Sequence, residues 1–112
     1  MEILAPAGSM EALTAAVRCG ADAVYVGGRS FSARASAQNF DSDELYEAAR
    51  ICHLHGVKLY RAMNTVIFDS ETEAFAEEVR ISAQAGVDGL IIQDMGAAAI
   101  ARAVVPDMVL CR

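Results

Sequence analysis

The repeated stretch that decides the fold is Cys19-Gly20-Ala21-Asp22-Ala23-Val24-Tyr25-Val26, which returns in altered form as Ala85-Gly86-Val87-Asp88-Gly89-Leu90-Ile91-Ile92. A shorter relative, His55-Gly56-Val57-Lys58-Leu59-Tyr60, lies between them. In each copy a glycine follows a helical pattern and precedes an apolar run. Glycine suits the left-handed conformation that ends a helix, because it has no Cβ to clash. The repeat therefore predicts a helix that turns at a glycine directly into a strand.

Polar residues indicate where the helices begin. Ser9 precedes a predicted helix over residues 10–18, and the pairs Asp41/Glu44 and Ser70/Glu73 have the spacing of a capping box. Pro106 is expected to stop the fourth helix. Apolar residues of the two middle helices recur at helical spacing, namely Leu45, Ala48, Ala49 and Cys52, then Phe75, Val79 and Ala83.

The predicted strands cover residues 3–5, 23–27, 57–64, 89–93 and 108–111. Most are nearly continuous apolar runs, which is typical of parallel strands covered on both faces. The alternation predicts an α/β fold: a single segment, 1–112, of four βα units plus a fifth strand. One candidate architecture is a small open doubly wound sheet. The other is the N-terminal half of a TIM-type barrel, which needs about 250 residues. Because the chain stops in or just after a strand, we expect it to be truncated from a larger catalytic domain.

Composition excludes several classes of protein. Apolar residues make up 54% and charged residues 21% of the chain, so it is not disordered. The net charge of −6 argues against a freestanding nucleic-acid binder. No apolar run approaches the roughly 18 residues of a membrane span, and the N-terminus lacks a signal-peptide pattern, so we expect a cytoplasmic protein with no membrane partner. Cys19, Cys52 and Cys111 form no CxxC pair and are expected to be buried apolar residues.

Ligands of parallel α/β folds sit beyond the carboxyl ends of the strands. The segment 28–40 after the second strand spans 13 residues and holds Arg29 and Arg34 but no acid. Arginine grips carboxylate or phosphate in a bidentate fork. An anion site is one interpretation of this segment; pairing of both arginines with surface acids is the other. The tentative ligand-binding residues are Arg29, Arg34, Asn39, Asn64 and Asp94, and the catalytic residues stay unknown.

Alternation along the third strand predicts that Asn64 points into the barrel mouth and Arg61 points outward toward the helices. The stem of Arg61 is expected to pack there while its head reaches an acid on a flanking helix. His53 and His55 are two apart on a helix and point away from each other, so we expect no metal site. No hydrolytic motif is present.

Several motifs resemble the start of the collagenase-like peptidase family U32. They are Glu2-Ile3-Leu4-Ala5-Pro6-Ala7-Gly8-Ser9, Gly20-Ala21-Asp22-Ala23-Val24-Tyr25-Val26-Gly27-Gly28, Phe31-Ser32-Ala33-Arg34-Ala35, Asn39-Phe40, Gly56-Val57-Lys58-Leu59-Tyr60, Asn64-Thr65 and Gly86-Val87-Asp88-Gly89-Leu90-Ile91-Ile92-Gln93-Asp94. The resemblance implies a barrel-type catalytic domain of which this is the N-terminal half. Arg61 departs from it, because a small apolar residue is usual at that position.

The resemblance implies alternative functions for the full-length parent. Members are commonly labelled peptidases or collagenases, so the main expectation is a fragment of a peptidase. The alternative is a fragment of an oxygen-independent hydroxylation factor, since other members act in this way on transfer RNA, ribosomal RNA or the ubiquinone precursor. These hydroxylation factors carry an iron–sulfur cluster on cysteines that lie well downstream, so we expect no cofactor in this segment and a cluster only in such a parent. A peptide or RNA substrate is implied for the parent, while the isolated segment is expected to be an inactive, structural half-barrel. Its unpaired sheet edges predict a homodimer or higher oligomer.

Overall fold

A computed structural model describes residues 3–27, 42–63, 72–92 and 94–111 of the chain. These residues form strands and helices in strict alternation. No helix among them is long and apolar enough to cross a membrane. The elements are β1 (Leu4–Ala7), α1 (Met10–Arg18), β2 (Ala23–Gly27), α2 (Ser42–Leu54), β3 (Lys58–Ala62), α3 (Thr72–Ala85), β4 (Gly89–Ile91), α4 (Met95–Val104) and β5 (Val109–Cys111).

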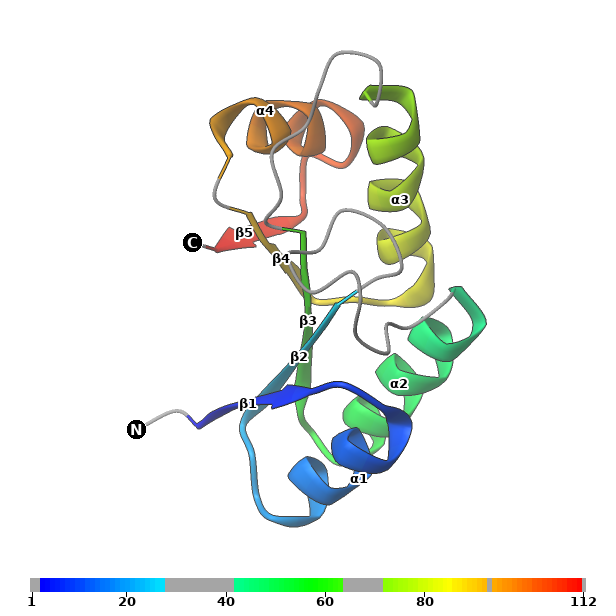
Figure 1. Ribbon diagram of the computed structural model, residues 1–112, viewed down its shortest axis with the longest axis vertical. Helices are drawn as coiled ribbons and strands as arrows, with labels where there is room; N and C mark the ends of the chain where they lie inside the picture. The colour runs from blue at the N-terminus through cyan, green and yellow to red at the C-terminus, as the bar shows by residue number, and fades with distance from the viewer. Residues whose placement is uncertain (1–2, 28–41, 64–71, 93, 112) are drawn as a thin grey trace.

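The strands form one parallel sheet in the order β1-β2-β3-β4-β5. Figure 1 shows the sheet curving with the helices on its outer side, while the inner side carries no helix of the described part. A doubly wound sheet reverses its strand order at a switch point and carries helices on both faces. Sequential order with helices on one face is the arrangement of a (β/α) barrel, so the half-barrel prediction is confirmed and the open doubly wound alternative is wrong.

The hydrophobic core lies between the sheet and the helices. Outward-facing strand residues such as Val24, Leu59 and Leu90 are fully buried against Leu13 of α1 and Phe75 of α3. The predicted apolar positions of α2 are all buried, and so are Phe75 and Val79 of α3. Helical periodicity in the sequence therefore locates the faces that α2 and α3 bury.

The three repeat glycines adopt the predicted left-handed conformation, with φ of 90° at Gly20, 71° at Gly56 and 95° at Gly86. Helix α1 begins where predicted, because the Ser9 hydroxyl accepts a hydrogen bond from Ala12 N at 3.1 Å. Helix α4 ends two residues before Pro106, as expected. The first residue of each predicted capping box, Asp41 and Ser70, lies outside the described residues.

Some strand boundaries differ from the prediction. Strand β1 continues through Pro6 to Ala7, because proline is tolerated on an edge strand, where its missing N–H can face away from the ladder. Strand β3 ends at Ala62, and β4 ends at Ile91. The sequence prediction ran these strands further because the apolar pattern continues through Met63 and Ile92, which are buried beyond the last ladder pair.

Candidate functional site: the carboxyl rim of the half barrel

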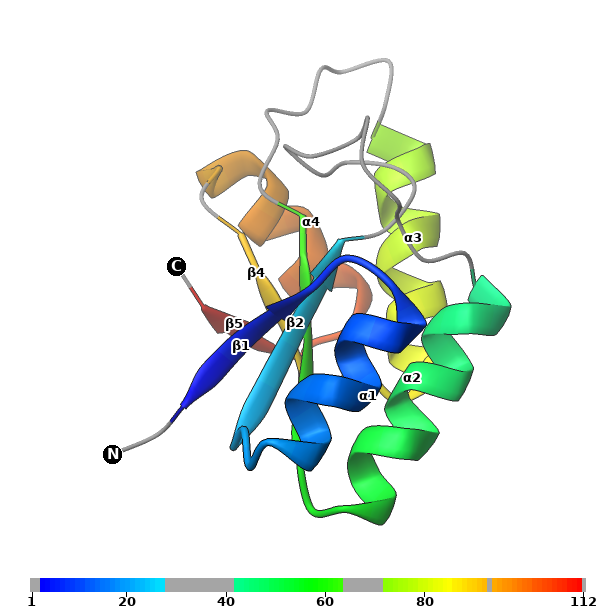
Figure 2. The same cartoon turned by 60° about the horizontal axis from the view of Figure 1, so that its bottom comes forward.

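The carboxyl ends of β1 to β4 lie at one rim of the sheet, and Figure 2 shows β2, β3 and β4 running toward it. Helices α1 and α4 begin at this rim, directly after β1 and β4. Backbone N–H groups at a helix start carry partial positive charge and attract anions. In parallel (β/α) folds this rim is the side on which a ligand is expected.

Asp94 is the one tentative ligand-binding residue that falls within the described part. It lies at the rim after β4 and is half-buried. Its Oδ2 accepts a hydrogen bond from Ala97 N at 3.1 Å, so Asp94 is the N-cap of α4. Ser9 has the same role at the start of α1. Asp94 thus has a structural task, stabilising the helix start, that the sequence analysis did not assign to it.

Arg29, Arg34, Asn39 and Asn64 lie outside the described residues, and their roles stay predictions. The structure does fix where their segments begin. β2 ends at Gly27, so the chain enters segment 28–40 from the rim. The prediction for Asn64 assumed that side chains alternate between the two faces of the sheet along β3. This alternation is observed as far as residue 63.

The prediction that Arg61 points outward toward the helices is confirmed. Its side chain is 2% exposed. Nη2 donates to Glu78 Oε1 at 2.7 Å, and Nη1 donates to Ser82 Oγ at 2.8 Å and to the Glu78 carbonyl at 3.2 Å. The predicted acid on a flanking helix is therefore Glu78 of α3. Arg61 joins β3 to α3 and faces away from the barrel interior.

The opposite rim carries a feature that the sequence analysis missed. Asp22 Oδ2 accepts a hydrogen bond from Ile3 N at 2.7 Å, and Asp88 Oδ2 accepts one from Leu59 N at 2.7 Å. In each case the aspartate lies just before one strand and holds the start of the preceding strand. His53 Nε2 lies 2.8 Å from the same Asp88 oxygen. We call these two contacts, Asp22 with Ile3 N and Asp88 with Leu59 N, the aspartate clamps. The repeated Gly-x-Asp motif was the feature of the sequence that could have indicated them.

Cysteine and histidine placement limits the chemistry of the described part. Burial, with a smaller contribution from the charge of Asp88, raises the pKa of Cys52 to about 11, so its thiol is a poor nucleophile. Cys19 is exposed at the end of α1, so the prediction that it is buried is wrong. The side chain of Cys111 lies outside the described part. Within the described ranges, no three His, Cys, Asp or Glu side chains come together as metal ligands.

The fold defines the class of protein: one half of a parallel (β/α) barrel whose carboxyl rim is the expected ligand side. Comparison with known proteins then gives the family. The profile of peptidase family U32 matches residues 8–111, so the chain belongs to this family.

Relatives of two kinds share this part of the sequence. A collagenase of Porphyromonas gingivalis is 41% identical over 97 residues, which cover 86% of this chain and 23% of the relative. A 23S rRNA 5-hydroxycytidine synthase of Escherichia coli is 40% identical over 96 residues, covering 86% of this chain and 14% of the relative. The chain thus spans less than a quarter of either protein.

A solved structure supports the architecture. The U32 peptidase Mk0906 superposes on 98% of this chain with a TM-score of 0.70 and 12% sequence identity. The match covers 47% of the solved chain. At this identity the likeness concerns the fold, and it agrees with the half-barrel topology.

Proposed function

We propose that this chain supplies the N-terminal barrel half of a U32 family enzyme that acts on RNA, with the carboxyl rim as the side that meets the RNA backbone. The observation that carries the proposal is the charge of the sequence that directly follows β2. Gly27 ends β2 at the rim, and the segment that follows holds Arg29 and Arg34 but no acid, in a chain of net charge −6. A segment whose sequence carries a local positive charge suits a polyanionic substrate better than a neutral peptide.

Chemistry elsewhere on the rim supports the same substrate class. Helices α1 and α4 both direct their N-termini to it. The start of α1 is capped by the neutral Ser9 hydroxyl and suits a phosphate oxygen, whereas the Asp94 carboxylate already caps the start of α4. The identity of 40% to an enzyme named for hydroxylation of 23S rRNA is consistent with this assignment. An RNA substrate also agrees with the cytoplasmic location expected from the sequence.

The iron–sulfur cluster implied by the resemblance does not fit the described residues. Cys52 is enclosed in the core, Cys19 lies on the surface at the end of α1, and no described cluster of ligating side chains surrounds either. Cluster ligands would have to come from other parts of the parent protein. The role proposed for this half barrel is therefore to bind and orient the substrate.

A peptidase is the second candidate function, favoured by the 41% identity to a collagenase. The described residues offer it no nucleophile with a partnering base. The Cys52 thiol is buried, His53 contacts Asp88, and His55 Nδ1 lies 2.9 Å from the Ile51 carbonyl. Residues outside the described part would have to supply the hydrolytic chemistry.

The test uses the full-length parent protein and compares Arg34→Ala with Arg18→Ala. Arg18 is an exposed arginine at the far end of α1, near the opposite rim, and serves as the matched control. Anisotropy titration of labelled ribosomal and transfer RNA fragments should show at least about tenfold weaker binding for Arg34→Ala and little change for Arg18→Ala. Equal binding by both variants would remove Arg34 from the site.

Nucleoside mass spectrometry of RNA from a strain lacking the gene provides the activity readout. Loss of one hydroxylated nucleoside, restored by the wild-type gene, is expected. Failure to bind RNA together with cleavage of gelatin by the purified protein would overturn the RNA proposal and favour the peptidase.

A further inference from the structure

The outer surface of the molecule carries a shallow groove between α2 and α3. Figures 1 and 2 show these two helices side by side on the outer side of the sheet. They are the two middle helices of the described part, so the groove is not an edge of the half barrel. Its volume is about 380 Å³, which suits a small ligand or a short peptide. The residues that line it are Tyr46, Ala49, Arg50, His53, Leu54 and Ala85.

The groove lies away from the carboxyl rim. Leu54 and Ala85 are the last residues of α2 and α3, and each helix ends shortly before the strand that follows it begins. The groove is therefore near the amino ends of β3 and β4. A ligand bound there would leave the carboxyl rim free.

Two exposed apolar side chains form walls of the groove. Tyr46 is 61% exposed and Leu54 is 68% exposed. They lie about two turns apart on one face of α2, with Arg50 between them. The other large apolar side chains that are similarly exposed in the described part lie beside or on the edge strands, or at the start of α4; they are Ile3, Leu4, Val109 and Met95. Two such side chains gathered in one groove indicate a surface suited to a partner.

Arg50 supplies an oriented cation to this groove. Its Nε donates to Glu47 Oε2 at 3.0 Å, and its Nη2 donates to Glu47 Oε1. This bidentate pair holds the guanidinium in place. Nη1 has no hydrogen-bond partner among the described residues, so its two N–H donors are available to another acceptor.

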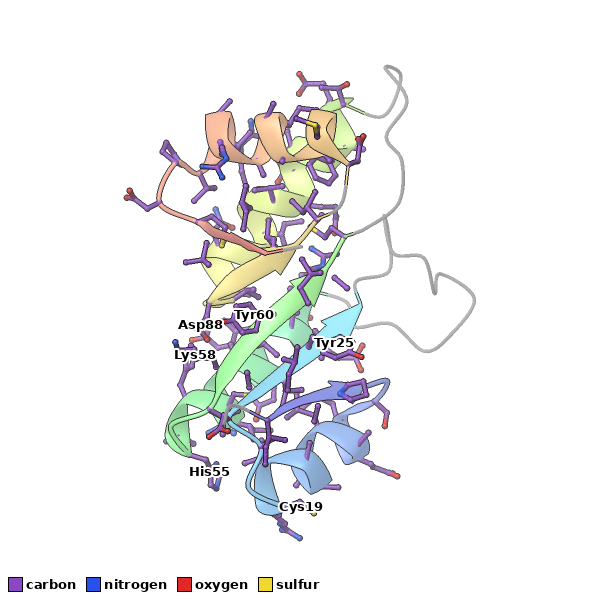
Figure 3. The ribbon with its side chains drawn as sticks, turned by 90° about the vertical axis from the view of Figure 1, so that its left-hand side faces the viewer. Cys19, Tyr25, His55, Lys58, Tyr60 and Asp88 are labelled. Atoms are coloured by element: carbon purple, nitrogen blue, oxygen red, sulfur yellow. The ribbon has the colours of Figure 1, made fainter. Side chains whose placement is uncertain are left out.

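His53 is oriented in a similar way by Asp88. Figure 3 shows Asp88 near Lys58, at the amino end of β3, and Asp88 Oδ2 lies 2.8 Å from His53 Nε2. A carboxylate only accepts hydrogen bonds, so Nε2 is the donor. Nδ1 of the neutral ring is then an acceptor, and no described residue bonds to it. Acids that do not line the groove thus orient both of its polar side chains and leave other atoms of each free.

We propose that the groove is a docking site for a peptide segment of another protein in which an acidic residue lies near a large apolar one. The acidic side chain accepts from Arg50 Nη1, and a peptide N–H donates to His53 Nδ1. The apolar side chain packs between Tyr46 and Leu54.

Charge complementarity favours this occupant. None of the described residues that line the groove is acidic, although the whole chain has a net charge of −6. A carboxylate in the groove would meet a guanidinium whose geometry is already fixed, so little side-chain entropy is lost on binding. An RNA backbone suits the groove less well, because it would leave Leu54 uncovered and would bring phosphates near Glu47.

The test screens the full-length parent protein on an array of short peptides that place one glutamate at varied spacings from one leucine or phenylalanine. Each peptide has an analogue with glutamine in place of glutamate. The variants are Arg50→Ala, Leu54→Asp and Arg80→Ala. Arg80 is the matched control, because it also pairs with a glutamate three residues earlier, Glu77, and is about half-exposed, but does not line the groove.

The wild type should retain a set of glutamate peptides and not their glutamine analogues. For the best peptide, anisotropy titration should show about tenfold weaker binding by Arg50→Ala, because a charge-assisted hydrogen bond is lost. Leu54→Asp should weaken binding by about the same factor, since it removes an apolar wall and adds a like charge. Arg80→Ala should bind as the wild type does. Circular dichroism checks that each variant is folded.

The proposal is overturned if no glutamate peptide is retained above its glutamine analogue, or if Arg50→Ala and Arg80→Ala bind equally well. Weaker RNA binding by Arg50→Ala, with no effect on peptides, would assign the groove to RNA instead. A wild-type dimer that Leu54→Asp dissociates, with no peptide bound, would assign it to a second copy. Because the peptide assay contains no RNA, its failure would not affect the RNA proposal for the carboxyl rim.

Discussion

Arg61 of β3 and Glu78 of α3 form an ion pair that joins a strand to the helix covering it, with Arg61 Nη2 and Glu78 Oε1 2.7 Å apart. The two side chains are unequally exposed, at 2% for Arg61 and 25% for Glu78. Arg61 Nε has no hydrogen-bond partner among the described residues. The guanidinium therefore depends on Glu78 and Ser82 for compensation, whereas Glu78 can also reach water.

Because Arg61 is buried and Glu78 is partly exposed, removing either side chain should lower the free energy of unfolding by a different amount. Glu78→Ala leaves a buried cation without its carboxylate and should lower the free energy of unfolding by about 2–3 kcal/mol. Arg61→Met keeps most of the buried volume and frees a carboxylate that water can solvate, so its cost should stay below about 1.5 kcal/mol. Urea denaturation followed by circular dichroism measures both.

Glu77→Ala on the same helix is the control for the Glu78 variant. Glu77 pairs with Arg80 at 3.1 Å, but both side chains are about half-exposed. The expected loss is below about 0.5 kcal/mol, as is usual for surface pairs. Similar losses for Glu77→Ala and Glu78→Ala would show that the buried position of Arg61 does not matter.

The aspartate clamps at the amino ends of the strands should differ in strength. Asp88→Ala leaves the partly buried Leu59 N–H without its acceptor and should cost about 1–3 kcal/mol. Asp22→Ala affects an exposed N–H at Ile3 and should cost less. Amide hydrogen exchange should show lost protection of Leu59 in the first variant.

His53→Ala separates the two contacts of Asp88. It removes the half-exposed histidine and leaves the bond to Leu59 N, so a loss of only about 0.5 kcal/mol is expected. If His53→Ala destabilises the protein as much as Asp88→Ala does, the histidine contact and not the backbone clamp holds β3.

Local features of this fold were predictable from the sequence, and contacts between distant residues were not. The φ values of Gly20, Gly56 and Gly86 and the Ser9 cap follow from residue preferences within one turn of chain. The clamps join residues 19 and 29 positions apart, so no local pattern reveals which N–H each aspartate holds.

The same distinction explains the outcome for individual side chains. The outward direction of Arg61 followed from strand alternation, but the identity of Glu78 depended on how α3 packs. Cys19 was expected to be buried from residue type alone, yet it caps a helix end that faces solvent. Asp94 was assigned to the ligand side by its place after a strand, which left its hydrogen bond to the α4 backbone unforeseen.

Cys52 should make stability depend on alkaline pH. Its pKa is about 11 in the folded chain against an ordinary value of 9.0, so the unfolded state releases the thiol proton first. The contribution of Cys52 is complete below pH 9 and is lost as the pH rises toward 11. From pH 9 to pH 11 the free energy of unfolding of the wild type should therefore fall by about 2 kcal/mol relative to that of Cys52→Ala.

Alkylation followed by peptide mass spectrometry gives a second readout for the cysteines. At pH 8 iodoacetamide should label exposed Cys19 quickly and buried Cys52 slowly. Equal labelling rates in the folded protein would mean that Cys52 is accessible, and the predicted pH dependence would then have no basis.

Substitution by alanine should change the free energy of unfolding in opposite directions at Gly89 and at Gly96. A Cβ at Gly89 would lie 2.8 Å from two ring carbons of Tyr60 and 3.0 Å from the Val109 carbonyl oxygen, whereas at Gly96 its nearest contact would be 3.5 Å. Gly89→Ala should therefore lower the unfolding free energy by about 1–3 kcal/mol. Gly96→Ala, within α4, should raise it by about 0.5 kcal/mol because alanine loses less backbone entropy in a helix.

A double-mutant cycle identifies the source of the Gly89 effect. The half-buried ring of Tyr60 can be removed by Tyr60→Ala, but the Val109 carbonyl belongs to the backbone of β5 and cannot be. If the ring is the main obstacle, Gly89→Ala should cost at least about 1 kcal/mol less in the Tyr60→Ala background than in the wild type. An unchanged cost would assign the clash to the Val109 carbonyl, which would mean that the spacing between β4 and β5 requires glycine at this position.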